Sequence, residues 1–169
     1  STTSRAARIV LIGAGLAGKT SLQRGLRHGA PRPSKPDERT IQLDIHSLPL
    51  GSGAEQVVLS MWDLAGQPEY AAGLQPYIVP GSLYLLTVPA FDVASLDADY
   101  SNILGRWLDY LTTGAPDAVV QVVLTHCDRL AGLPPEGATH ENYAYAASAQ
   151  LDWIKGGIER HQSGIPEEK

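Results

Sequence analysis

Residues 8–20 read RIVLIGAGLAGKT, and this stretch determines how the rest of the chain is interpreted. Its first five residues are almost wholly apolar and stop at Gly13, which is typical of a strand buried in a parallel sheet. The remainder satisfies the pattern G-x-x-x-x-G-K-[ST], and residues 19–28 have a helical composition. A strand, a glycine loop and a helix in this order predict a phosphate-binding loop, because N–H groups at a helix N-terminus attract anions. The alternative is a glycine-rich turn that carries an exposed lysine.

The loop contains the residue types that a nucleotide triphosphate needs. Its glycines let backbone N–H groups face the α- and β-phosphates. Lys19 is expected to reach the β- and γ-phosphates, and the hydroxyl of Thr20 to ligate Mg²⁺. The predicted phosphate-binding set is Gly13, Ala14, Gly15, Leu16, Ala17, Gly18, Lys19 and Thr20.

A second motif, Asp63-Leu64-Ala65-Gly66, follows an apolar run at residues 56–62. Ligands of open α/β sheets bind at the carboxyl ends of strands, so this turn is expected to lie at the site. Asp63 is predicted to hold Mg²⁺ through a water, and the Gly66 N–H to approach a γ-phosphate. Gln67 follows and is placed to orient an attacking water. Taken alone, D-x-x-G is also a common turn.

A third motif, Thr125-His126-Cys127-Asp128, closes another apolar run at residues 118–124. A carboxylate here can accept hydrogen bonds from the guanine N1–H and exocyclic amine, a pattern that adenine lacks, so Asp128 is predicted to select guanine. An ordinary turn at a strand end is the alternative. Cys127 is expected to be a small buried side chain rather than a nucleophile.

Strand and helix patterns alternate along the chain and predict a doubly wound, mostly parallel α/β sheet with helices on both faces. Residues 41–48 and 56–62 are predicted to form a hairpin within this sheet. Helices are expected at residues 102–111, where Trp107 lies on the apolar face, and at 147–161, where Gly156 and Gly157 weaken the pattern. The expected strands are residues 8–12, 41–48, 56–62, 82–88 and 118–124.

Composition narrows the class of protein further. The 169 residues carry a net charge of −5, which argues against nucleic-acid binding, and a hydrophobic content of 43% excludes disorder. One cysteine favours a reducing, cytoplasmic location. Residues 70–91 are uncharged and long enough to cross a bilayer, but three prolines within them argue against a membrane helix. We expect a buried strand there and no transmembrane segment.

Taken together, the motifs resemble a Ras-like small G protein of the P-loop NTPase class, and specifically the Roc domain of Roco proteins. Three features favour Roc: T-H-C-D in place of N-K-x-D, Trp62 before Asp63, and the segment that leads from Leu74 to Tyr84. The resemblance covers residues 7–130 well. It implies that the chain binds GTP and GDP with Mg²⁺ and hydrolyses GTP slowly. It also implies a COR domain and other domains in the same longer chain. The expected partners are protein effectors or regulators and a second copy of the protein, in a homodimer formed mainly outside this domain.

The resemblance also assigns individual roles. Ser21 lies near the α-phosphate, and Thr40 is the switch threonine that completes the Mg²⁺ shell, although it also fits an ordinary strand start. Thr125 replaces an asparagine that normally braces the loop, which weakens the expected nucleotide affinity, and His126 covers the guanine or ribose face. Two arginines, Arg32 and Arg39, are candidates for neutralising transition-state charge, although solvated side chains are the more common outcome. The implied catalytic set is Gln67, Lys19 and Gly66; the metal set is Thr20, Thr40 and Asp63; and the base set is Thr125, His126 and Asp128.

The C-terminal part departs most from the family. Ser148-Ala149-Gln150 either forms a base-contacting loop or belongs to a helix that precedes a last strand. We favour the helix. Residues 1–169 are then expected to form a single domain that belongs to a larger protein, and this domain is expected to lack the last strand and helix of the fold. Two functions remain in competition: a GTPase switch, and a nucleotide-bound scaffold with negligible turnover. An ATP-dependent enzyme is a third and weaker alternative.

Overall fold

The computed structural model describes residues 5–30, 43–67, 71–90, 100–129 and 140–164, which form one mixed α/β fold. Within these residues a five-stranded sheet has the order β2-β3-β1-β4-β5. The elements are β1 (Arg5–Gly13), α1 (Lys19–His28), β2 (Leu43–Leu50), a 3₁₀ turn (Gly53–Glu55), β3 (Val57–Leu64), α2 (Ala71–Leu74), a 3₁₀ turn (Gln75–Tyr77), β4 (Leu83–Pro89), a π-helical turn (Ser101–Gly105), α3 (Arg106–Gly114), β5 (Val119–Thr125), a 3₁₀ turn (Cys127–Arg129) and α4 (His140–Ser163).

Strand pairing confirms the predicted sheet. β1 lies parallel to both β3 and β4, and β4 lies parallel to β5. Among the five described strands only β2 runs antiparallel, paired with β3, which is the hairpin that the alternating pattern predicted. Because β1, β3, β4 and β5 are parallel, their carboxyl ends meet at one edge of the sheet, and the loops that follow them lie there together.

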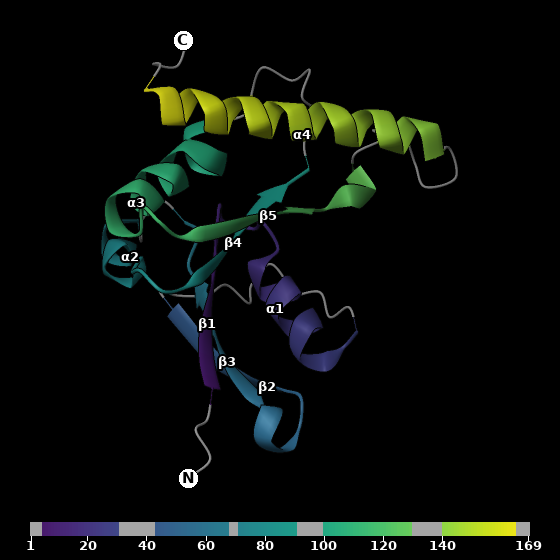
Figure 1. Ribbon diagram of the computed structural model, residues 1–169. Coiled ribbons are helices and arrows are strands. Elements are labelled where there is room, and N and C mark those ends of the chain that lie inside the picture. The colour runs from purple at the N-terminus through teal and green to yellow at the C-terminus, as the bar shows by residue number, and fades with distance from the viewer. Residues whose placement is uncertain (1–4, 31–42, 68–70, 91–99, 130–139, 165–169) are drawn as a thin grey trace.

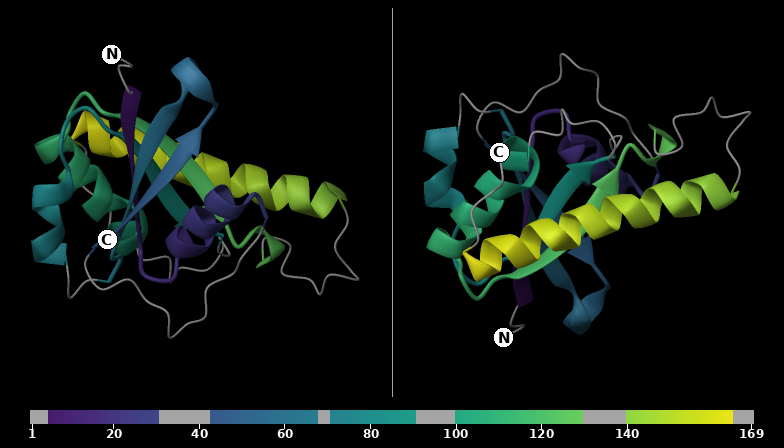
Figure 2. Two further views of the ribbon diagram at one scale, coloured as in Figure 1. Left: turned by 90° about the horizontal axis from the view of Figure 1, so that it is seen from below. Right: turned by 90° about the horizontal axis from the view of Figure 1, so that it is seen from above.

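Helices cover both faces of the sheet (Figure 1). The two views of Figure 2 show α1 in front of the sheet from below and α4 in front of it from above. On the second face, Val10 and Ile12 of β1 belong to the main hydrophobic core with Trp107 of α3 and Ile154 of α4. Leu11 alternates with them and is also fully buried, so β1 is buried on both sides, as its apolar sequence predicted.

The described part of the uncharged stretch, residues 71–90, contains α2, a 3₁₀ turn and β4. Tyr84, Leu86 and Val88 are fully buried, and the hydroxyl of Tyr84 donates to the carbonyl of Val79 at 2.7 Å. In the described part of the chain, no helix is long and apolar enough to cross a membrane. The run is therefore apolar because it supplies a central strand.

Two helices differ from their predicted bounds. The helix expected from residue 102 begins with a π-helical turn, Ser101–Gly105, before α3 proper. The last helix, α4, starts seven residues earlier than expected and continues through both glycines. Ser148, Ala149 and Gln150 lie within α4, so the helical alternative for this segment is the correct one.

Gly157 explains why α4 tolerates a glycine at its centre. A Cβ atom at this position would lie 2.7 Å from Leu104 Cδ2 and 2.9 Å from Tyr100 Cε2, so α4 packs closely against the start of the α3 segment. The hydroxyl of Tyr100 donates to the carbonyl of Gly157 at 3.1 Å, and its ring meets Trp153 edge-on. The glycine thus permits a helix contact that a side chain would prevent.

This contact predicts opposite effects for two adjacent glycines. Gly157→Ala should destabilise the fold by about 1–3 kcal/mol, because the methyl group overpacks the contact. Gly156→Ala is the matched control: the nearest atom to its Cβ is the movable end of Arg160 at 3.3 Å, so the better helix former should stabilise by about 0.5–1 kcal/mol. Urea unfolding measures both values. Equal effects at the two positions would contradict the packing of α4 described above.

Candidate functional site

Lys19 occupies the centre of the phosphate loop and is buried. Its ammonium group donates to the carbonyls of Gly13 and Ala14, both at 2.8 Å. Gly18, in the left-handed region at φ 82°, precedes it and starts α1. The side chain therefore folds back over the loop, and its charge lies inside the ring of backbone that the motif predicts.

The electrostatic environment of Lys19 favours an anionic ligand. Burial lowers its pKa from 10.5 to about 8; the nearby Asp63 carboxylate opposes this shift, and the positive charge of Arg106 adds to it. A buried cation with incomplete compensation gains free energy when a phosphate approaches. The loop is thus electrostatically prepared for an anion.

Thr20 and Asp63 meet beside this lysine. The hydroxyl of Thr20 donates to Asp63 Oδ2 at 2.6 Å, although 43 residues separate them in the sequence. Asp63 is 1% exposed and lies directly opposite Leu11 of β1, so sheet register brings it to the loop. A hydroxyl and a carboxylate are hard oxygen donors of the kind that Mg²⁺ takes together with phosphate oxygens, so these residues fit that ion.

The D-x-x-G turn packs directly on the loop. A Cβ atom at Gly66 would lie 2.3 Å from the carbonyl oxygen of Gly13 and 2.4 Å from Ala14, so only glycine permits this approach. Gln67 also reaches the loop, since its Cγ lies 3.2 Å from the Cβ position of Gly15. The structure therefore brings Gly66 and Gln67 together with the phosphate loop.

Two consecutive residues of the third motif bind the loop from its other side. Thr125 Oγ1 donates to the carbonyl of Ala17 at 2.7 Å, and His126 Nε2 lies 2.9 Å from the carbonyl oxygen of Leu16. Because a carbonyl only accepts, Nε2 carries the proton in this contact. Thr125 therefore braces the loop directly, which the sequence did not indicate.

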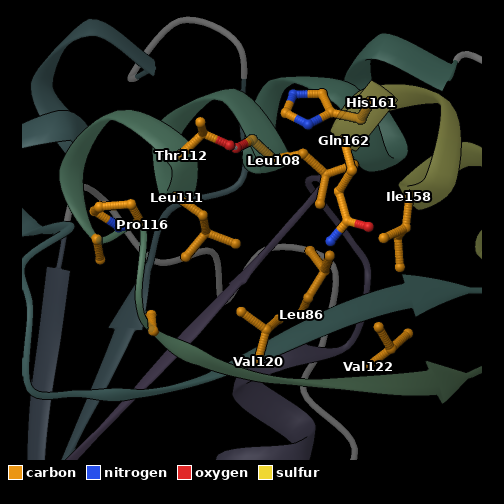
Figure 3. Close-up of a pocket in the computed structure, with 12 residues that line it drawn as sticks. Leu86, Leu108, Leu111, Thr112, Pro116, Val120, Val122, Ile158, His161 and Gln162 are labelled. Atoms are coloured by element: carbon orange, nitrogen blue, oxygen red, sulfur yellow. The ribbon is translucent and has the colours of Figure 1, made fainter. Parts of the chain in front are cut away.

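Two cavities of similar size lie on different sides of the molecule. One, of about 600 Å³, lies between α1 and the end of β5, and Gly18, Ser21, Thr125, His126 and Asp128 all contribute to its wall. The other, of about 570 Å³, lies between α3, α4 and the last two strands, where Leu86, Val122, Leu111 and Ile158 surround it (Figure 3). Only the first contains predicted site residues, so the base-recognition motif opens onto that cavity.

Cys127 differs from its predicted burial, and three other predicted residues are not described by the structure. Cys127 is exposed rather than buried, because it lies in a 3₁₀ turn outside the strand; partial burial and the neighbouring Asp128 raise the pKa of its thiol. Thr40, Arg32 and Arg39 lie outside the described residues.

Sequence reasoning missed Arg106, the first residue of α3. Its Nη2 donates to the carbonyl of Gly66 at 3.1 Å, so it contacts the D-x-x-G turn directly. It lies within a predicted helix, and no local sequence pattern indicates its contact with Gly66.

A phosphate loop, an Asp-x-x-Gly turn and a base-recognition loop at one edge of this sheet define a Ras-like P-loop NTPase fold. The model of the family described as "Ras of Complex, Roc, domain of DAPkinase" matches residues 8–128, and the chain belongs to this family.

The chain is also similar to several curated Rho-related and GTP-binding proteins. It is 29% identical over 121 residues to the Rho-related protein racC of Entamoeba histolytica, covering 72% of this chain and 59% of racC. It is 30% identical over 133 residues to the GTP-binding protein rho3 of Schizosaccharomyces pombe, covering 79% of this chain and 61% of rho3. It is 35% identical over 107 residues to the human Rho-related GTP-binding protein RhoD, covering 61% of this chain and 46% of RhoD. The chain thus spans about half to three fifths of these proteins.

The lowered pKa of Lys19 predicts proton uptake when a phosphate ligand binds. With a pKa of about 8, the free side chain is about half neutral at pH 8 and about one tenth neutral at pH 7. A phosphate favours the ammonium form and raises the pKa, so binding of GDP should take up about half a proton at pH 8 and much less at pH 7. Calorimetry in buffers of different ionisation enthalpy measures this uptake. Lys19→Arg, which does not titrate here, reports the ligand's own ionisation; equal uptake by both proteins would contradict the prediction.

Proposed function

We propose that this chain is a guanine-nucleotide switch that binds GTP and GDP with Mg²⁺ and hydrolyses GTP slowly. The observation that carries the proposal is the convergence of two distant segments, the Asp-x-x-Gly turn and the third motif, on the phosphate loop. Thr20 bonds Asp63, Gly66 packs on Gly13, and Thr125 bonds Ala17. These contacts bring the phosphate loop, the Asp-x-x-Gly turn and the third motif together, which supports one site that would bind the phosphates, sense the γ-phosphate and recognise the base. Membership of a Ras-like family supports the same function.

The metal belongs to this proposal. Thr20 and Asp63 would hold Mg²⁺, and Thr40 would complete the shell in the GTP state. The ion, when bound, would neutralise charge on the phosphate oxygens. The residues of this chain would do the rest: Lys19 would bind the β- and γ-phosphates, and backbone N–H groups of residues 14–20 would hold the α- and β-phosphates.

Hydrolysis would proceed by in-line attack of a water on the γ-phosphorus. The bond between this phosphorus and the β–γ bridging oxygen would break, leaving GDP and inorganic phosphate. Gln67, whose Cγ lies near Gly15, would orient the water, and the Gly66 N–H would bind a γ-phosphate oxygen. Loss of the γ-phosphate would release the turn that carries both residues, which is the event that a switch transmits.

Guanine selectivity tests this function most directly. Asp128→Asn should weaken GDP binding at least about tenfold, because it removes a charged acceptor, and should increase affinity for xanthosine diphosphate. Asp117→Asn, at an exposed loop position, is the matched control and should leave both affinities unchanged. Calorimetry with GDP, ADP and xanthosine diphosphate provides the measurement. ADP binding as tight as GDP binding would refute the proposed specificity, and GDP binding retained in Lys19→Ala would refute the phosphate site.

The role of Gln67 separates a switch from a nucleotide-bound scaffold. If the side chain orients water, Gln67→Leu should lower the single-turnover rate of GTP hydrolysis at least about tenfold while GDP affinity changes little. Gln121→Leu, on the exposed part of β5, is the control substitution. A negligible rate in the unmodified protein, or an unchanged rate in Gln67→Leu, would favour the scaffold.

We further propose that residues 1–169 act as a single Roc domain of a larger cytoplasmic Roco protein, next to a COR domain and other domains that form a homodimer and bind regulators or effectors. The family match over residues 8–128 supports this setting. In this setting a conformational change at Gly66 would reach the neighbouring domains through the helices packed on the sheet.

A further inference from the structure

One side chain outside the known motifs contacts the γ-phosphate-sensing turn. Arg106 Nη2 donates to the carbonyl of Gly66 at 3.1 Å and to Asn102 Oδ1 at 2.9 Å. The two contacts share one nitrogen, so the turn and the π-helical segment Ser101–Gly105 meet at this guanidinium. Because the Gly66 carbonyl belongs to the peptide that joins Gly66 to Gln67, the arginine holds the backbone between these two residues.

The guanidinium is held firmly from the helix side. It lies over the ring of Trp107 at 4.9 Å from the centroid, and Trp107 is fully buried with its Nε1 donating to the Asn102 carbonyl at 3.2 Å. A planar cation stacked on a ring and bonded to an amide loses little freedom when it binds one more acceptor. The helix therefore restrains the guanidinium that donates to the turn.

The segment that carries this arginine is connected to α4. Gly105 packs against the ring of Tyr100, because a Cβ atom on Gly105 would lie 2.8 Å from Tyr100 Cε1. The hydroxyl of Tyr100 in turn donates to the Gly157 carbonyl. A π-helical turn inside a helix is uncommon and often marks a functional position. Here it lets one nitrogen of Arg106 donate both to Asn102 Oδ1 and to the Gly66 carbonyl, and it links the turn to α4.

The charge of Arg106 also acts on the phosphate site. It adds to the positive potential at Lys19. The Lys19 ammonium lies beside the carbonyls of Gly13 and Ala14, and Gly66 packs against these same two residues. Arg106 is thus one peptide unit from the loop, and its charge favours an anion there.

We propose that Arg106 is a positioning residue that holds the Gly66–Gln67 peptide against the phosphate loop and so favours the GTP-bound over the GDP-bound state. The inference rests on the proposed function. It differs from a transition-state arginine, because the guanidinium acts on the backbone carbonyl of the turn and not on the reacting phosphate. Asn102 supports it by orienting the guanidinium.

The test compares affinities for a non-hydrolysable GTP analogue and for GDP. Arg106→Ala should weaken binding of the analogue about tenfold or more and GDP binding less than about threefold, because only the γ-phosphate needs the turn in place. The single-turnover rate of GTP hydrolysis should fall with it. Arg106→Lys, which keeps the charge and one donor, should recover part of the loss, and Asn102→Ala should shift the affinity ratio in the same direction as Arg106→Ala. Arg160→Ala, at an exposed position on α4, should change nothing.

Other outcomes would overturn the inference. Equal losses for both nucleotides with a lower melting temperature would show a purely structural role. Full recovery in Arg106→Lys with no effect of Asn102→Ala would show that charge alone matters. If the unmodified protein binds guanine nucleotides but the affinity ratio is unchanged in Arg106→Ala, only this inference fails. If the unmodified protein binds no guanine nucleotide, the proposed function fails and the inference with it.

Discussion

The structure depends on one buried positive charge. The ammonium group of Lys19 is enclosed by the carbonyls of Gly13 and Ala14, and a loop of any other shape would leave those donors and acceptors unpaired. The Asp63 carboxylate partly compensates this charge, and the parallel pairing of β1 with β3 brings it to the same edge of the sheet. A cation held with this little compensation costs stability in the free protein and gains it when an anion binds. The strand order therefore serves the site, because β1 leads into the phosphate loop and its neighbour β3 carries Asp63.

Several features of this arrangement could be predicted because they are local or follow from sheet geometry. The run before Gly13 predicts a strand, the loop predicts the helix that starts at Lys19, and parallel strands predict that Asp63 and Thr125 meet the loop at one edge. Sequence periodicity also places Trp107 in the core, where it is fully buried. Each of these conclusions needs only the residues of one segment and the rule that neighbouring strands share an edge.

Other features depend on contacts between segments that no periodicity reveals. Arg106 looks like an exposed helix residue until the turn that carries Gly66 is placed beside it. The extension of α4 through Gly156 and Gly157 opposes intrinsic helix propensity, and it holds because Gly157 allows Tyr100 to approach the helix. Cys127 is expected to be buried from its place within the third motif, but β5 ends at Thr125 and a 3₁₀ turn exposes the thiol.

The third motif, Thr125-His126-Cys127-Asp128, is joined to the phosphate loop by unusual backbone conformations. Leu16 and His126 both adopt positive φ, at 62° and 54°, which is uncommon for side chains of their size. The hydrogen bond between them, and the parallel one from Thr125 to Ala17, hold two consecutive residues of each loop together. Strained backbone persists where neighbouring contacts over-determine it, and here those contacts join the phosphate loop to the turn before Asp128. The third motif and the phosphate loop thus share one hydrogen-bonded piece of backbone, which a threonine and a histidine hold together.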